Sequence, residues 1–85
     1  MKIYRSQTFK KQFRKLPQHA IEAFEQRLHL YLIDPNAFEL NNHKLKGKWS
    51  GSRSINVTGD YRLVLQKDER GLWLQAIGTH SELYR

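Results

Sequence analysis

The hydrophobic periodicity of this chain changes near Asp34-Pro35, and that change limits the fold more than any other feature. Before this point, apolar residues recur at intervals of three or four positions, which is helical spacing. After it, apolar and polar residues alternate over short segments, which is strand spacing. A chain with helices first and strands later predicts an α+β domain, in which the helices cover a sheet.

Two amphipathic helices are expected before the change. Phe9, Phe13 and Leu16 mark the first, and Ser6 stands where it can cap the helix. Pro17 breaks that pattern and is suited to the start of a second helix. The apolar stripe of the second helix consists of Ile21, Phe24, Leu28, Tyr31 and Leu32. Adjacent amphipathic helices joined at a proline predict a helical hairpin.

The second half of the chain predicts three strands separated by short turns. They are expected at residues 54–57, 61–66 and 72–77, and strands joined by short turns pair antiparallel. Residues 1–5 alternate enough to predict one further short strand. Residues 36–52 are polar and contain several glycines, so we expect mainly loop there.

The predicted order is therefore β-α-α-β-β-β in a single domain spanning residues 1–85. Thr79 and Glu82 have the spacing of a capping box, which predicts a short C-terminal helical turn. We expect the helical hairpin to pack on one face of an antiparallel sheet. The other face, or its edges, is then left for a ligand. The candidate positions on that face are Asn56, Arg62, Val64 and Gln75.

Length and composition exclude several classes of protein. A chain of 85 residues fits one domain, and without cysteine it can form neither disulfides nor thiolate zinc sites. No apolar run approaches the roughly 20 residues of a membrane helix, and the first residues lack the apolar stretch of a signal peptide. We therefore expect a mature cytoplasmic protein that does not engage a membrane.

The charge of the chain is strongly positive and unevenly distributed. Fifteen Lys and Arg against eight Asp and Glu give a net charge of +7, which attracts phosphate backbones and acidic proteins. One basic group lies within residues 1–15, where a solvated helix face is an equally good interpretation. The second group surrounds Trp49 and Tyr61, and basic residues among aromatic ones suit RNA. Its members are Lys44, Lys46, Lys48, Arg53 and Arg62.

His43 and His80 are candidate catalytic residues because each stands at a loop or strand end in polar company. With Asp60 they offer the acid and the base that RNA cleavage by an attacking 2′-hydroxyl needs. His19 and His29 fall in the predicted helices, and we interpret them as structural or surface residues. The spacing contains no metal-ligand cluster, so we expect neither a metal nor another cofactor.

Several segments together resemble one known group of proteins. They are residues 43–47 (His-Lys-Leu-Lys-Gly), 49–53 (Trp-Ser-Gly-Ser-Arg), 59–63 (Gly-Asp-Tyr-Arg-Leu) and 77–84 (Ile-Gly-Thr-His-Ser-Glu-Leu-Tyr). The chain resembles the RelE/ParE toxin superfamily along its whole length, and specifically the YafQ-like mRNA interferases. The resemblance implies a toxin of a type II toxin–antitoxin system. Such a toxin is a ribosome-dependent endoribonuclease that cleaves mRNA, and a cognate acidic antitoxin neutralises it.

The resemblance also implies roles for individual residues. His80 matches the family's general acid, and either Asp60 or His43 is the base. Tyr61 stands where these toxins usually have tryptophan, and Tyr84 matches their terminal aromatic residue. Both would position the RNA. The residues expected to hold phosphate are Lys44, Lys46, Arg53 and Arg62.

Two positions depart from the pattern of the family. Asn56 replaces a further histidine, and Ala76 replaces an arginine that could stabilise the transition state, a task for which Arg62 is the available substitute. These departures keep two alternatives open. One is a ParE-like toxin that inhibits gyrase, and the other is a catalytically weakened relative that still binds its antitoxin.

Overall fold

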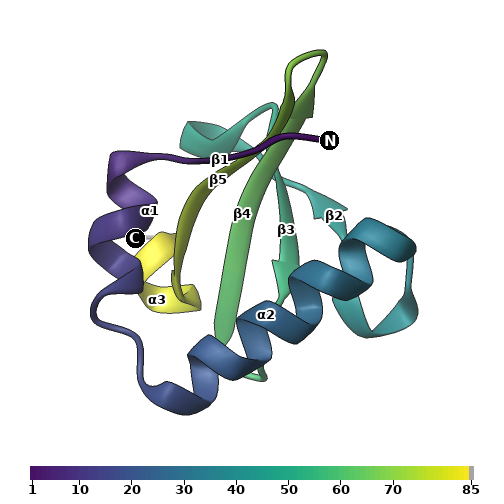
Figure 1. Ribbon diagram of the computed structural model, residues 1–85. Coiled ribbons are helices and arrows are strands. Elements are labelled where there is room, and N and C mark those ends of the chain that lie inside the picture. The colour runs from purple at the N-terminus through teal and green to yellow at the C-terminus, as the bar shows by residue number, and fades with distance from the viewer. Residues whose placement is uncertain (85) are drawn as a thin grey trace.

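The computed structural model describes residues 1–84 and has the predicted order of helices and strands (Figure 1). Residues 36–52, expected to be mainly loop, also contain a two-residue strand and two short 3-10 turns (η1 and η2). The elements are β1 Ile3–Arg5, α1 Gln7–Phe13, α2 Gln18–Ile33, η1 Phe38–Leu40, β2 His43–Lys44, η2 Gly47–Trp49, β3 Arg53–Asn56, β4 Tyr61–Asp68, β5 Gly71–Thr79 and α3 His80–Leu83.

The helices begin and end where the sequence places their signals. The Ser6 hydroxyl accepts a hydrogen bond from the backbone N–H of Phe9, which confirms Ser6 as the cap of α1. Pro17 precedes the first residue of α2, and that helix ends at Ile33, just before Asp34 and Pro35. Helix α3 starts after Thr79 with both halves of the predicted capping box formed. No helix within residues 1–84 is long and apolar enough to cross a membrane.

The strands form one five-stranded sheet in the order β1-β5-β4-β3-β2. The antiparallel prediction holds for β2 to β5, whereas β1 pairs parallel with β5. Parallel pairing needs a long connection, which the segment containing α1 and α2 supplies. The close approach of β1 also requires glycine at position 71, because a Cβ atom there would collide with the carbonyl oxygen of Lys2.

The main hydrophobic core lies between the sheet and the helices α1 and α2. In Figure 1, α2 crosses one face of the sheet and α1 lies beside it. The rings of Phe9 and Phe24 pack with centroids 5.6 Å apart at its centre. The other buried members are Tyr31, Leu40, Ile55, Val57, Leu63, Leu65, Leu72, Leu74 and Ile77.

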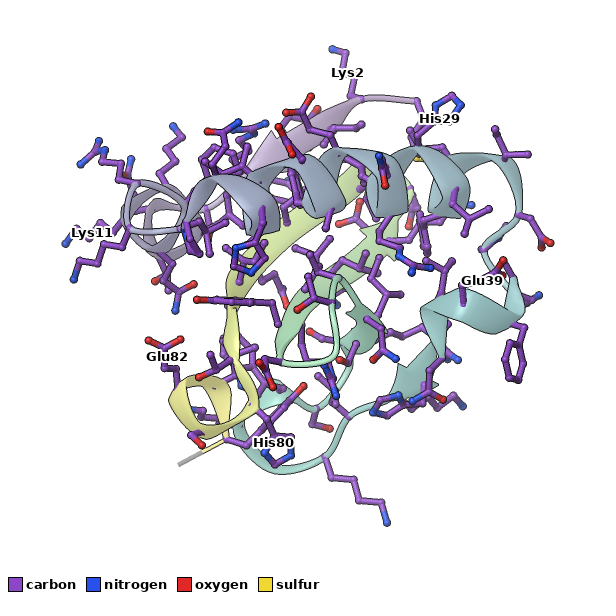
Figure 2. The ribbon with its side chains drawn as sticks, turned by 90° about the horizontal axis from the view of Figure 1, so that it is seen from below. Lys2, Lys11, His29, Glu39, His80 and Glu82 are labelled. Carbon is purple, nitrogen blue, oxygen red and sulfur yellow. The ribbon has the colours of Figure 1, made fainter. Side chains whose placement is uncertain are left out.

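The opposite face of the sheet carries a second, smaller core. Val64, Ala76 and Leu83 are buried there, and Leu45, Trp49 and Tyr84 pack around them. Figure 2 shows α2 and α3 on opposite sides of the sheet, so α3 covers part of the face that the sequence left for a ligand. The centre of that face is therefore closed, and the polar positions available to a ligand lie at its ends and edges.

Candidate active site

Asp60 and His80 line one open cleft of about 390 Å³, although twenty positions separate them in the sequence. The register of the β4–β5 hairpin explains this proximity. Tyr61 pairs with Thr79, so the residue before β4 and the residue after β5 lie at the same end of the sheet. The remaining lining residues are Gly59, Tyr61, Thr79 and Ser81.

His80 is the first residue of α3 and lies on the side of the molecule away from α2 (Figure 2). The capping box fixes the start of the helix, since Glu82 accepts from the Thr79 N–H at 2.8 Å and Thr79 accepts from the Glu82 N–H at 3.3 Å. The indole N–H of Trp49 holds its other end by donating to the carbonyl of Leu83 at 3.0 Å. The exposed ring of His80 lies 4.7 Å from that of Tyr84, centroid to centroid. The backbone of His80 is thus fixed by hydrogen bonds at both ends of α3, while its ring lies exposed at the cleft.

Asp60 lies in the tight turn between β3 and β4, and its side chain is exposed. The Thr58 hydroxyl accepts hydrogen bonds from the backbone N–H groups of Asp60 (3.1 Å) and Tyr61 (3.0 Å), which fixes the conformation of the turn. The one salt bridge within residues 1–84 joins Asp68 to Arg70 at the other end of the hairpin. Within residues 1–84 the Asp60 carboxylate therefore has no salt-bridge partner, and it lies exposed at the cleft.

Arg62 supplies a fixed positive charge beside this turn. Its Nη1 donates to the carbonyl oxygens of Thr58 and Gly59, each at 3.0 Å, and to that of Tyr61 at 3.2 Å. Arg62 pairs with Gly78, two positions from Ala76 on the same strand, so it lies on the face that carries Ala76. Arg62 does not itself line the cleft, although Gly59, to which it is bonded, does.

Tyr61 has two surroundings, the main core and the cleft. Its ring packs against the main core and meets the ring of His19 edge-on, with centroids 6.2 Å apart. It also lines the cleft and a neighbouring cavity of about 130 Å³ that includes Lys15. Lys15, which follows α1, thus lies closer to the cleft than the sequence suggested, whereas Lys11 of α1 points into solvent in Figure 2.

His43 lies on β2, and the structure does not bring it into the cleft of Asp60 and His80. His43 pairs with Ser54 on β3, Ser54 pairs with Val64 on β4, and Val64 pairs with Ala76 on β5. Three strand spacings of roughly 4.8 Å each therefore separate His43 from β5. Its Nδ1 bonds to the carbonyl of Asn41 at 2.8 Å, and this requires a proton on Nδ1 because a carbonyl can only accept. Of the two candidate bases, Asp60 is the one that lies near His80.

The predicted phosphate ligands of the second basic group do not line the cleft either. Arg53 pairs with Leu65, a residue of the main core, and its Nε donates to Asn42 Oδ1 at 2.6 Å. Arg53 therefore lies on the helical side of the sheet, near Tyr31. Burial raises the pKa of Tyr31, and the positive charge of Arg53 acts in the opposite direction. Lys44 pairs with Arg53, and Lys46 is exposed before η2.

The family model described as a bacterial toxin of type II toxin–antitoxin systems, YafQ, matches residues 1–85. The chain belongs to this family. The predicted resemblance to YafQ-like members of the RelE/ParE superfamily is confirmed, and the protein is a toxin of a type II system. Among curated proteins, none matches the chain.

Solved structures of toxins share the fold over nearly the whole chain. YafQ from E. coli is 20% identical with a TM-score of 0.85, covering 99% of this chain and 98% of that one. A copper-bound mutant toxin from Helicobacter pylori is 28% identical with a TM-score of 0.76, covering 99% of each chain. A chain of the RelB–RelE antitoxin–toxin complex from Methanococcus jannaschii is 16% identical with a TM-score of 0.73, covering 95% of this chain and 94% of that one.

The two departures from the YafQ pattern differ in their surroundings. Ala76 is fully buried in the small core with Val64 and Leu83, so the space beside it is filled. Asn56 is half-buried next to Arg62, and its Oδ1 is enclosed without a hydrogen-bond partner within residues 1–84. No group of three His, Asp or Glu side chains in this part of the chain could hold a metal ion.

The sequence did not show that Trp49 and Thr79 support the helix of His80, nor that Lys15 lies near the cleft. The capping-box spacing of Thr79 predicted a helix start, and only the strand register places that start beside Asp60. Trp49 bonds to Leu83 across 34 positions of sequence, a separation for which no local pattern exists.

Proposed function

We propose that this toxin is a ribosome-dependent endoribonuclease that cleaves mRNA and so blocks translation. The observation that carries the proposal is the shared cleft of Asp60 and His80. Arg62 does not line the cleft, but its Nη1 donates to the carbonyl of Gly59, which does. A carboxylate and an imidazole in one open cleft, with a cation bonded to its rim, are the groups that RNA cleavage requires.

In the proposed reaction, the Asp60 carboxylate removes the proton of a ribose 2′-hydroxyl. The 2′-oxygen attacks the adjacent phosphorus and the bond to the 5′-oxygen breaks, while protonated His80 donates its proton to that leaving oxygen. Arg62 stabilises the negative charge that develops on the phosphorane. The products are a 2′,3′-cyclic phosphate and a 5′-hydroxyl. Side chains fill every role, so we propose that the reaction needs no metal ion.

The proposed partners follow from charge and from the relatives. E. coli YafQ has been solved in complex with DinJ, and RelE in complex with the antitoxin RelB. We propose that a cognate acidic antitoxin likewise binds this chain, whose net charge of +7 complements it. The same charge favours binding to the RNA of the ribosome. Because its substrate is translated mRNA, we place its action in the cytoplasm.

The test is expression of the toxin without antitoxin, followed by primer extension on translated messages. Wild type is expected to arrest growth and to create new ends inside those messages. His80→Ala removes the proposed acid, which typically contributes about 10²- to 10⁴-fold to a rate, and is expected to abolish both effects. His29→Ala is the matched control, because His29 is exposed on α2, far from His80 (Figure 2).

Other results of this expression test would indicate a different function. Arrest with intact messages would contradict the ribonuclease. If His80→Ala remained toxic and supercoiling were inhibited, the toxin would act on gyrase. A wild type that binds its antitoxin tightly but does not arrest growth would be a weakened relative.

A further inference from the structure

A second cavity, of about 420 Å³, opens beside β3 on the side away from β4. Strand β2 covers only the first half of β3, since its two residues pair with Arg53 and Ser54. Beyond them, η1 and the residues around it lie next to Asn56 and form the cavity wall. The residues that line it, one of them acidic, are Asn36, Ala37, Phe38, Glu39, Asn41, Asn42 and Asn56.

Phe38 presents its side chain to solvent at this cavity with 94% of its surface exposed. The backbone that carries it is well fixed. Asn42 donates to the carbonyl of Pro35 at 2.8 Å, and the Asp34 carboxylate accepts from the Asn36 N–H at 3.2 Å. Asn41 adopts a left-handed conformation with φ 45° and donates its N–H to the carbonyl of Phe38. The backbone at Phe38 is therefore held at a defined place, and the ring projects from it into solvent.

The other lining side chains are mostly amides. Asn56 reaches the cavity from the sheet, and its Oδ1 is enclosed without a hydrogen-bond partner within residues 1–84. An enclosed amide oxygen without a partner is costly, so a rotation of the Asn56 side chain that brings this oxygen to an N–H donor in the cavity would relieve that cost. Asn36 and Asn41 are exposed at the rim. Amides that can both donate and accept, next to a free aromatic ring, match the edge and the face of an unpaired nucleobase.

The cavity begins at the row of paired strand residues next to the cleft of Asp60 and His80. Asn56 pairs with Arg62, and Arg62 pairs with Gly78, so about two strand spacings, roughly 10 Å, separate the Asn56 backbone from β5, and Phe38 lies farther out beyond β3. A nucleotide a few positions along the RNA from the scissile phosphate can reach it. Positive charge is also present at the rim, because Arg53 is bonded to Asn42 and Lys44 is its neighbour on β2. This charge attracts the phosphate groups of a polynucleotide and would equally attract an acidic peptide, so the amides and the exposed ring are the features that favour a base.

We propose that this cavity binds an unpaired base of the RNA that is cut at Asp60 and His80, an inference that rests on the proposed function. The base stacks on Phe38, and Asn56 and the rim amides bond to its edge. Arg53 and Lys44 hold the phosphate next to it. The cavity thereby contributes to the choice of cleavage position, and Asn56 acquires a role in place of the histidine that the family pattern expects.

The test measures binding of 2′-O-methyl hexaribonucleotides, each made of a single base, because these RNAs cannot be cleaved. Phe38→Ala removes the stacking surface and is expected to weaken binding about 10-fold for the preferred base. Phe38→Trp keeps an aromatic face and is expected to bind as wild type does. Ile33→Ala is the control, since Ile33 is also exposed but lies on α2, outside the cavity. Asn56→Ala is expected to reduce the difference in affinity between bases.

Equal affinities of Phe38→Ala and wild type for all four RNAs would overturn the inference. So would a loss of affinity for the purified antitoxin with RNA binding unchanged, because Phe38 would then belong to the antitoxin interface. The readout does not depend on catalysis. Base-dependent binding at Phe38 in a toxin that leaves messages intact would support this site and contradict the proposed ribonuclease.

Discussion

The two faces of the sheet differ in what their side chains do. The helical face buries eleven side chains in a continuous core with α1 and α2. The opposite face buries three apolar side chains, which lie under the single turn of α3 and the segment around Trp49. Burial of apolar surface is the main source of stability, so most of it comes from the helical face. The other face can keep polar and exposed groups at its ends, and the proposed catalytic residues lie there.

The largest expected effect is on the helical face. Phe24→Ala leaves a cavity against Phe9 and Phe13, and is expected to lower the free energy of unfolding by about 3–5 kcal/mol. That is a large part of the stability of a domain this small. Urea denaturation followed by circular dichroism measures the loss. A change below about 1 kcal/mol would contradict the assignment of the main core.

Leu83→Ala is the matching change in the small core, where Leu83 is fully buried. We expect a smaller loss of about 2 kcal/mol, because α3 is a single turn near the chain end and can collapse onto the space left. Hydrogen exchange should rise in α3 and not in α2. Equal exchange in both helices would mean that the two faces unfold as one unit.

The two capping residues separate stability from activity. Thr79→Ala removes the cap of α3 and is expected to cost about 1 kcal/mol, and to lower activity because His80 loses its fixed position. Ser6→Ala removes the cap of α1 and also the hydrogen bond from Ser6 Oγ to the Gln75 carbonyl. It is expected to cost at least as much stability while activity is kept. Loss of activity in both variants, measured under conditions where both are folded, would show that the site is not local to α3.

The smallest expected effect is on stability at acid pH, and it comes from Asp68 at the far end of the β4–β5 hairpin. The backbone N–H of Arg70 is the main cause that lowers the pKa of Asp68 below its ordinary value, and the N–H of Gly71 adds to it. A carboxyl group whose pKa is lowered by folding stabilises the fold at pH values above its ordinary pKa. This contribution is lost as the pH falls through the lowered pKa. Asp68→Asn should therefore flatten the fall of the urea midpoint in acid and leave activity at neutral pH unchanged. A fall as steep as that of wild type would contradict this assignment.

The sequence predicted the elements well because each has a local signal. The spacing of Phe9, Phe13 and Phe24 gave the helices, and the spacing of Thr79 and Glu82 gave the last turn. Register and strand order have no such signal. Whether Arg53 faces the helices depends on its pairing with Leu65, and the parallel pairing of β1 depends on contacts about 70 positions apart.

For the candidate site, too, the sequence predicted the residues but not their arrangement. Motifs identified Asp60, His80 and His43 as chemically suitable residues, but only the β4–β5 pairing brings the first two together. His43 remains three strands away, and the buried position of Ala76 depends on α3 folding back over the sheet. Chemistry can be read from residue types, whereas convergence depends on the fold.

The most direct test of the account is single-turnover cleavage of ribosome-bound mRNA by the purified toxin. We predict a cut that leaves a 2′,3′-cyclic phosphate, and a rate about 10²- to 10⁴-fold lower for His80→Ala. A message with a 2′-deoxynucleotide at the cleavage position should stay intact, because it lacks the attacking oxygen. Cleavage of that message at the rate of the ordinary one, or an unchanged rate for a variant that lacks both Asp60 and His80, would contradict the proposed chemistry of the cleft.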